Sequence, residues 1–252
     1  MFISKDQFIS EYLERIEYHG GTAPCLETLI ELQRQHVYHV PFENLDILRG
    51  LTPNLDRDFL FNKIVRRRRG GVCYELNTAF YYLLTALGFS ACQISGRCRL
   101  GTPLTGHVFT LVHLNEGDYT ADVGYGDSVV PPLRIGGEAV SAYHTTSWLE
   151  RDEDGLLRLY QQNPHEEPTF QYQFSLESRE QADYMDTFRF AAAPGNTVFS
   201  ERHICCLSIP AGRITLRRGI LTIKLENQVV ESRPIAPGEE TSRCLWEYFG
   251  FT

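Results

Sequence analysis

Cys73 has clear chemical potential because of the segments on either side of it. Upstream, apolar residues at helical spacing lead into four consecutive arginines and then Gly70-Gly71. This pattern predicts a helix end, with cations at the negative end of the helix dipole and glycine as the left-handed stop. Downstream, residues 76–87 carry an apolar helical face. Cys73 is therefore predicted to start a helix, where the dipole and unpaired N–H groups favour a thiolate and can stabilise an oxyanion.

The same residues also have plainer interpretations. A single buried cysteine is most often a small apolar core residue, and a run such as arginines 66–69 is most often a solvated helix end. Nucleic-acid binding is disfavoured, because the chain has a formal net charge of −8 and no aromatic-rich basic repeat surrounds the arginines. The predicted helix start alone leaves Cys73 open between a catalytic and a structural role.

Four separated motifs favour a catalytic role, because a known family carries them in the same order. They are His39-Val40-Pro41-Phe42-Glu43-Asn44-Leu45, then Arg69-Gly70-Gly71-Val72-Cys73-Tyr74-Glu75-Leu76-Asn77, then Gly106-His107, and then Asp122-Val123-Gly124-Tyr125-Gly126. Together they resemble an arylamine N-acetyltransferase, densely over residues 37–135 and more loosely beyond. The resemblance implies a papain-like Cys-His-Asp triad of Cys73, His107 and Asp122. It also implies acetyl transfer from acetyl-CoA to arylamines, aryl hydrazines or arylhydroxylamines.

Such a triad would work by ping-pong acyl transfer. The Cys73 thiolate attacks the acetyl carbon, CoA leaves, and an amine then attacks the acetyl thioester. Asp122 would fix the tautomer of His107 and stabilise its cation, so a thiolate–imidazolium pair is the expected resting state. Without the family resemblance, His107 reads as a strand histidine of the core and Asp122 as a strand-end cap.

The resemblance also points to substrate-binding residues. Phe42 and Tyr125 match positions that line the family's acceptor pocket, where flat rings would stack on an aromatic amine, and core packing is the alternative. Tyr125 stands where phenylalanine is commoner in relatives, so its hydroxyl favours a more polar acceptor. The remaining positions are Gly106 for the acceptor, and Phe188, Gly195 and Asn196, which align loosely with CoA contacts.

Composition is that of an ordinary globular protein. The 252 residues are 42% hydrophobic and 22% charged. The N-terminus lacks a cationic segment followed by an apolar one, and no run of about 18 apolar residues occurs, so a cytoplasmic protein without a membrane span is expected. Seven cysteines without CxxC spacing and eight histidines without an HExxH pair predict neither a disulfide framework nor a metal site. The physiological acceptor, the acyl-chain range and the oligomeric state stay open.

These residues need three regions to position them, which together make an α+β protein. Residues 1–88 are predicted to form a helical bundle carrying Cys73, residues 89–194 an antiparallel β-barrel carrying His107 and Asp122, and residues 195–252 an α/β lid. Helices are predicted near residues 5–16, 26–40, 59–69 and 73–87. Strands are predicted near residues 91–100, 107–114, 119–123, 133–140, 147–149, 156–161, 169–176, 203–209, 213–217 and 221–225, with further helices at 178–188 and 241–249.

The hairpin that carries His107 and Asp122 has two possible registers. If Asn115-Glu116 forms a two-residue turn, Asp122 is a diagonal neighbour of His107, at about 7 Å between Cβ atoms. If Glu116-Gly117 forms the turn, Asp122 lies roughly 13 Å away along the strand and the triad cannot form without a bulge. The sequence does not choose between the two registers.

Other classes of protein could use the same residues. A thiol hydrolase or transglutaminase-like enzyme would let water or lysine reach the thioester of Cys73. An amide synthase of the same family would close a macrolactam from a chain delivered by a polyketide carrier. A binding protein that has lost catalysis is the third alternative, against which the intact triad argues.

Overall fold

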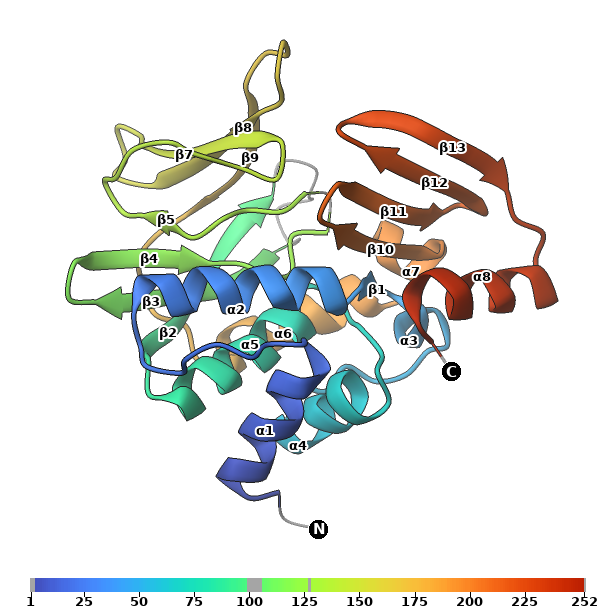
Figure 1. Ribbon diagram of the computed structural model, residues 1–252, viewed down its shortest axis with the longest axis horizontal. Helices are drawn as coiled ribbons and strands as arrows, with labels where there is room; N and C mark the ends of the chain where they lie inside the picture. Colours follow the sequence, from blue (N-terminus) through green and yellow to red (C-terminus); the bar gives the residue numbers. More distant parts are fainter. Residues whose placement is uncertain (1–2, 99–105, 127, 252) are drawn as a thin grey trace.

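The computed structural model of the protein describes residues 3–98, 106–126 and 128–251. Figure 1 shows helices below two sheets, with the C-terminal sheet and helix on the right. Segregated helices and antiparallel sheets confirm the predicted α+β class. In these described ranges, no helix combines the length and apolar character that a membrane span requires. The helices are α1 (Lys5–Arg15), α2 (Leu26–His39), α3 (Leu45–Leu48), α4 (Arg57–Leu60), the π-helix η1 (Phe61–Arg66), α5 (Cys73–Leu87), α6 (Gln181–Ala192), α7 (Val198–Glu201) and α8 (Glu239–Phe249).

The strands form two antiparallel sheets. The first has eight strands in the order β5-β4-β3-β2-β9-β8-β7-β6 and curls toward a barrel (Figure 1). The second has the order β1-β10-β11-β12-β13, so a strand from the N-terminal region completes the C-terminal sheet. The division into three domains stays a prediction. The strands are β1 (Phe42–Glu43), β2 (Ser90–Cys98), β3 (Gly106–Leu114), β4 (Gly117–Ala121), β5 (Leu133–Arg134), β6 (Val140–Ala142), β7 (Thr145–Arg151), β8 (Leu157–Gln162), β9 (Thr169–Phe174), β10 (Ile204–Ile209), β11 (Gly212–Arg217), β12 (Ile220–Leu225) and β13 (Gln228–Pro234).

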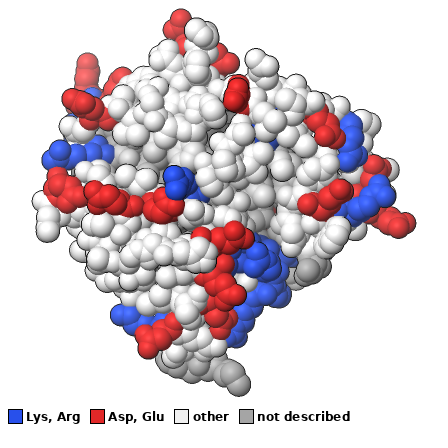
Figure 2. Space-filling model, in the orientation of Figure 1, with Lys and Arg blue, Asp and Glu red and all other residues white. Residues whose placement is uncertain are grey.

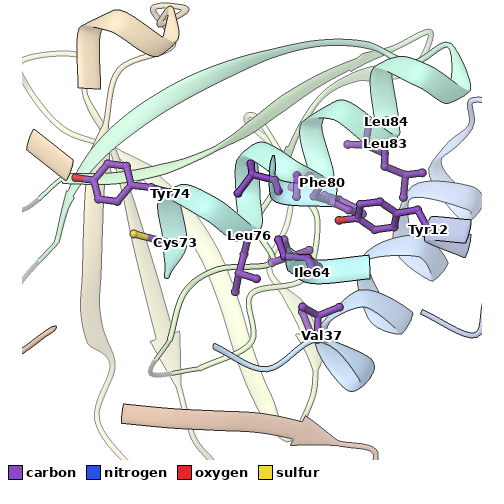
Figure 3. Packing of buried hydrophobic residues seen from close by; sticks show 14 of the residues in the cluster. Tyr12, Val37, Ile64, Cys73, Tyr74, Leu76, Phe80, Leu83 and Leu84 are labelled. Carbon is purple, nitrogen blue, oxygen red and sulfur yellow. The ribbon is translucent and has the colours of Figure 1, made fainter. Parts of the chain in front are cut away.

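The N-terminal helices share one apolar core. Phe80 and Leu83 on α5, Tyr12 on α1 and Ile64 on η1 all have 0% exposed surface and belong to the same cluster. Figure 3 shows these side chains along α5, with Cys73 at the opposite, N-terminal end of the helix. Burial of this apolar surface holds α5 in place and so fixes the position of its first residue.

The break before α5 differs from the sequence prediction. The helix ends at the first of the four arginines, and the residue with a left-handed backbone is Arg68, with φ 51°, rather than a glycine. Gly70 is needed for a close approach instead, because a Cβ there would lie 1.8 Å from the Pro41 carbonyl oxygen. The glycine therefore lets the segment before Cys73 pass directly against the chain that leads into β1.

The arginine run is divided between the surface and the interior. Arg66 forms a surface ion pair with Glu11, with its Nε 2.9 Å from Oε2. Arg69 is 14% exposed and pairs with the fully buried Glu43 at 2.6 Å. The face in Figure 2 shows acidic side chains directly beside a basic patch. The interpretation of a solvated helix end thus holds for Arg66 and is wrong for Arg69.

The β3–β4 hairpin has the register in which Asn115-Glu116 forms the turn. Leu114 pairs with Gly117 across it. Asp122 therefore stays close to His107 instead of lying farther along the strand. The structure selects the register that permits the triad.

Other elements also depart from the prediction, and one predicted strand is only partly described. The predicted strand at 133–140 is split into β5 and β6, because the chain turns at Gly136 with φ 70°. Residues 99–100 of the predicted strand 91–100 lie outside the described ranges. The sequence did not predict β13, where Val229 and Val230 are 56% and 57% exposed. Two adjacent exposed valines do not show the alternation that marks a half-buried strand.

Candidate active site

Cys73 is the first residue of α5, as the sequence predicted. The N-cap residue Val72 has no polar side chain, so the cap comes from Glu75, whose Oε2 accepts a hydrogen bond from the Val72 N–H at 3.1 Å. Gly71 lies against this carboxylate, since a Cβ there would be 2.7 Å from Oε2. Cys73 itself is 6% exposed. The thiol is held at a helix start and is nearly withdrawn from solvent.

The burial of this thiol changes its expected protonation. Burial raises the pKa of Cys73, and the neighbouring Cys98 and Asp122 act in the same direction, whereas backbone hydrogen bonds from Tyr74 and Val108 lower it. The helix N-terminus alone therefore does not provide the thiolate that the sequence suggested. A thiolate at this position needs a cation beside it.

His107 and Asp122 form a buried pair. The His107 Nε2 lies 2.6 Å from the Asp122 Oδ2, and the two side chains are 2% and 0% exposed. Since Nε2 faces the carboxylate, Nδ1 is the nitrogen left to act on a thiol. The loop after Asp122 packs on the start of α5, because a Cβ on Gly124 would be 2.8 Å from the Cys73 Cα. The three predicted triad residues are thus all buried, and the loop after Asp122 contacts the helix start that carries Cys73.

Four donors surround the Asp122 carboxylate. Its Oδ2 accepts from His107 and from the Tyr172 hydroxyl at 2.9 Å, and its Oδ1 accepts from the Asn77 amide and the Gly124 N–H, each at 3.0 Å. Burial acts to raise the pKa of Asp122, but the charge of His107 and these hydrogen bonds hold that pKa below its ordinary value. Asp122 is therefore an anion at neutral pH and orients the imidazole ring.

Asn77 joins α5 to the other parts of the site, although no role was predicted for it from the sequence. Its Nδ2 also donates to the Val108 carbonyl at 2.7 Å, and its Oδ1 accepts from the Val123 N–H at 2.9 Å. Asn77 thereby ties α5 to β3 and to the loop after β4. The available signal is a polar residue four positions after Cys73 on an apolar helix, because buried amides require partners. Tyr172 lies on β9 and has no comparable local signal.

The predicted acceptor residues lie around the same loop. A Cβ on Gly126 would be 2.9 Å from the Phe42 ring. The rings of Tyr125 and His107 are 5.4 Å apart, edge to face. The Tyr125 hydroxyl donates to Gln171 at 3.0 Å. Two aromatic side chains therefore border the loop that follows Asp122.

The residues predicted to contact the acceptor or CoA differ in how deeply they are buried. The Gly106 carbonyl accepts from the Tyr74 hydroxyl at 3.1 Å. Phe188 is 1% exposed and stacks on Tyr74, with ring centroids 4.6 Å apart. Gly195 and Asn196 lie in an exposed turn after α6. Contacts to CoA at Phe188, Gly195 and Asn196 stay a prediction.

A cavity of about 290 Å³ lies between the two sheets. Ser128 and Gln171 line it on one side and Arg213 on the other. The described lining residues do not include Cys73, His107 or Tyr125, and the link to the site is Gln171, which accepts from the Tyr125 hydroxyl. Among the described residues, no three His, Cys, Asp or Glu side chains are grouped as metal ligands. The polar lining offers hydrogen-bond partners to a small organic molecule.

Comparison with known proteins assigns the family. The family model for N-acetyltransferases matches residues 25–252. A protein of Escherichia coli (strain K12) named arylamine N-acetyltransferase is 30% identical over 250 residues, which are 96% of this chain and 88% of that protein. The chain belongs to the arylamine N-acetyltransferase family.

Two further proteins are similar to this chain over nearly its whole length. Proansamycin X synthase from Amycolatopsis mediterranei (strain S699) is 30% identical over 244 residues, covering 92% of this chain and 93% of that protein. The structure of Mycobacterium marinum arylamine N-acetyltransferase in complex with CoA has a TM-score of 0.88 and 29% identity, covering 96% of this chain and 92% of that one. The helices and both sheets are thus those of arylamine N-acetyltransferases, as the motifs predicted.

Proposed function

We propose that this protein transfers an acetyl group from acetyl-CoA, through a Cys73 thioester, to an arylamine, aryl hydrazine or arylhydroxylamine. The observation that carries this is the buried His107–Asp122 pair, 2.6 Å apart, beside a cysteine at a helix start. Family membership supports the acyl donor, since a similar structure contains CoA. No metal takes part in the proposed steps.

In the first half-reaction, the Cys73 thiolate attacks the carbonyl carbon of the acetyl thioester. The carbonyl oxygen becomes negative near the backbone N–H groups at the start of α5. The bond from carbon to the CoA sulfur then breaks, and the His107 imidazolium gives its proton to the departing sulfur. One thioester replaces another, and His107 is left neutral.

In the second half-reaction, the nitrogen of a neutral amine attacks the acetyl-Cys73 carbon. His107 takes the amine proton through Nδ1, and the Cys73 thiolate leaves, which restores the thiolate–imidazolium pair. Asp122 stabilises the cation through Nε2, at 2.6 Å. Formation of an amide from a thioester pulls this half-reaction forward.

Intact mass spectrometry tests the first half-reaction directly. Wild-type protein mixed with acetyl-CoA and no acceptor is expected to gain one acetyl group on Cys73, and added aniline should remove it. Cys73→Ser should gain none. Cys25→Ser is the matched control, because Cys25 is a partly exposed cysteine outside the site. A folded wild-type protein that takes up no acetyl group would contradict the proposal.

The acceptor preference follows from protonation and ring stacking. At pH 7 anilines and aryl hydrazines are neutral, whereas alkylamines, with pKa values near that of lysine at about 10.4, are mostly cationic. Anilines are expected to be acetylated faster than alkylamines of similar size. Rates corrected for the neutral fraction should narrow this gap, and any remainder measures stacking on Phe42 and Tyr125. A faster alkylamine would contradict the arylamine assignment.

The similarity to proansamycin X synthase favours a second candidate, an amide synthase that closes a macrolactam. Cys73 would then receive a long acyl chain, and an amine of that same chain would attack. The mass experiment separates the two functions. Labelling by a long-chain acyl thioester without labelling by acetyl-CoA would favour the synthase.

A further inference from the structure

Five charged side chains form a connected chain behind Cys73, and the proposed chemistry does not use them. The Lys63 Nζ lies 2.7 Å from the Glu75 Oε1 and 2.9 Å from the Asp46 Oδ2. The Arg69 Nη2 lies 3.1 Å from the Asp46 Oδ1 and 2.6 Å from the Glu43 Oε1. The chain thus runs from Glu75 through Lys63, Asp46 and Arg69 to Glu43. It connects α5, η1, α3 and β1.

Both ends of this chain reach the proposed site. Glu75, two residues after Cys73, caps α5 by accepting a hydrogen bond from the Val72 N–H. Glu43 directly follows Phe42, the predicted acceptor residue. The charged chain therefore joins the helix that presents the thiol to the strand that presents the aromatic ring.

Lys63 is the cation nearest the thiol end of the chain, and its side chain is 1% exposed. Burial acts to lower the pKa of Lys63, but the carboxylates of Glu75, Glu43 and Asp46 hold that pKa above its ordinary value. Lys63 is therefore charged at neutral pH. Burial raises the pKa of Glu75 above its ordinary value, and the charge and hydrogen bond of Lys63 act to lower it, so Lys63 is the cation that favours an ionised Glu75. Glu75 is two residues from Cys73, and an anion near a thiol disfavours the thiolate.

We propose that Lys63 is a positioning residue for Cys73, a role that rests on the proposed function of Cys73 as nucleophile. Lys63 holds Glu75 in place as the cap of α5 at 2.7 Å and cancels the charge that this cap brings near the thiol. Val72 has no side-chain acceptor of its own, so the helix start depends on Glu75. Lys63 makes an anionic cap compatible with a neighbouring thiolate.

Other charged or titratable groups also face the thiol. They are His107 on β3, Asp122 after β4, Cys98 on β2 and Tyr74 on α5. The variants below leave all of them in place. A change in the titration of Cys73 then traces to Lys63 and Glu75.

The pH dependence of Cys73 alkylation by iodoacetamide tests this role. Alkylation rates are measured from about pH 5 to about pH 9, and peptide mapping identifies Cys73 as the labelled residue. The readout is the pH at which the rate reaches half of its maximum. Lys63→Met is expected to raise it by about one unit, because Glu75 loses its partner. Glu75→Gln keeps an acceptor for the Val72 N–H without charge and should titrate at or below the wild-type pH. The double variant Lys63→Met/Glu75→Gln should return toward the wild-type value even if its melting temperature is lower.

Arg66→Met is the matched control, because Arg66 lies on the same π-helix and pairs with Glu11 at the surface. It should keep the wild-type profile. An unchanged profile in folded Lys63→Met overturns the proposal, and so does a double variant that titrates like Lys63→Met. If Lys63→Met does not fold, a higher midpoint in Glu75→Gln than in wild type overturns it. Alkylation needs no acetyl-CoA, so a wild-type protein that fails to accept acetyl contradicts the proposed function separately.

Discussion

At the scale of single residues, Asp122 is more strongly held than its place at a strand end suggests. Its carboxylate accepts four hydrogen bonds, from His107, Tyr172, Asn77 and Gly124. The three donors other than His107 hold the carboxylate in the orientation that faces the imidazole. In the proposed reaction, the charge that stabilises the His107 cation is thus already held in place.

Asp122→Asn is expected to slow acetylation of Cys73 by at least about 100-fold, because it removes this charge and can present an amide donor to Nε2. The apparent pKa of the thiol should rise, while the melting temperature changes less than activity. Stopped-flow acetylation across pH, beside thermal melting, measures both. Asp118→Asn is a matched control, since Asp118 pairs with His113 at 2.7 Å on the exposed part of the same hairpin. Near-wild-type acetylation by folded Asp122→Asn would remove Asp122 from the triad.

At the scale of elements, the site is the contact between the start of α5 and the loop after β4. Gly124 lies at this contact, where a Cβ would be 2.8 Å from the Cys73 Cα and 2.7 Å from the Asn77 Nδ2. Neither neighbour is the free end of a flexible side chain. The loop can therefore approach the helix this closely only with glycine at position 124.

Gly124→Ala is expected to push the loop away from α5 and to destabilise the protein by about 1–3 kcal/mol, the usual range for overpacking. The acetylation rate of the folded protein should also fall, by more than the loss of stability alone would cause, because Asp122 moves with the loop. Urea denaturation and acetylation rates test the two effects. Gly21→Ala is the control, since nothing lies within 4 Å of a Cβ there. Equal activity in both variants would show that the loop position does not matter.

At the scale of the whole molecule, a buried histidine links stability to pH. His36 on α2 is 0% exposed, bonds to the Tyr12 hydroxyl at 3.0 Å, and packs edge-on against Phe80 at 5.3 Å. Burial lowers the pKa of His36 to about 3, with the charge of Arg15 acting in the same direction. Three helices of the N-terminal core therefore meet at a neutral imidazole.

The unfolded chain binds a proton at His36 below about pH 6.5, whereas the folded protein does not until about pH 3. Stability is therefore expected to fall as pH drops through this window, by about 2 kcal/mol between neutral pH and pH 5. His36→Gln should flatten the fall, as measured by urea denaturation at both pH values. His113→Gln, at an exposed position, should not. The same slope in His36→Gln and wild type would contradict this account.

The sequence by itself determined the features that depend on neighbouring residues. Helix periodicity and the arginine and glycine residues that precede Cys73 placed it at the start of α5, and the motif order indicated the family and the α+β fold. The helical period is a local property, so a single sequence expresses it, whereas the end of the helix before α5 was not where the sequence predicted it.

Tertiary structure decided everything that depends on segments far apart in the chain. The hydrogen bonds of Asn77 and the burial that raises the pKa of Cys73 arise from packing between α5 and the first sheet. The bond from Tyr172 to Asp122 depends on where β9 lies in that sheet, and the hairpin register that keeps Asp122 near His107 was fixed only by the observed strand pairing. The local pattern at Cys73 indicated a thiolate, and burial opposes it. Desolvation and long-range pairing depend on which surfaces meet, and spacing along one segment does not encode that.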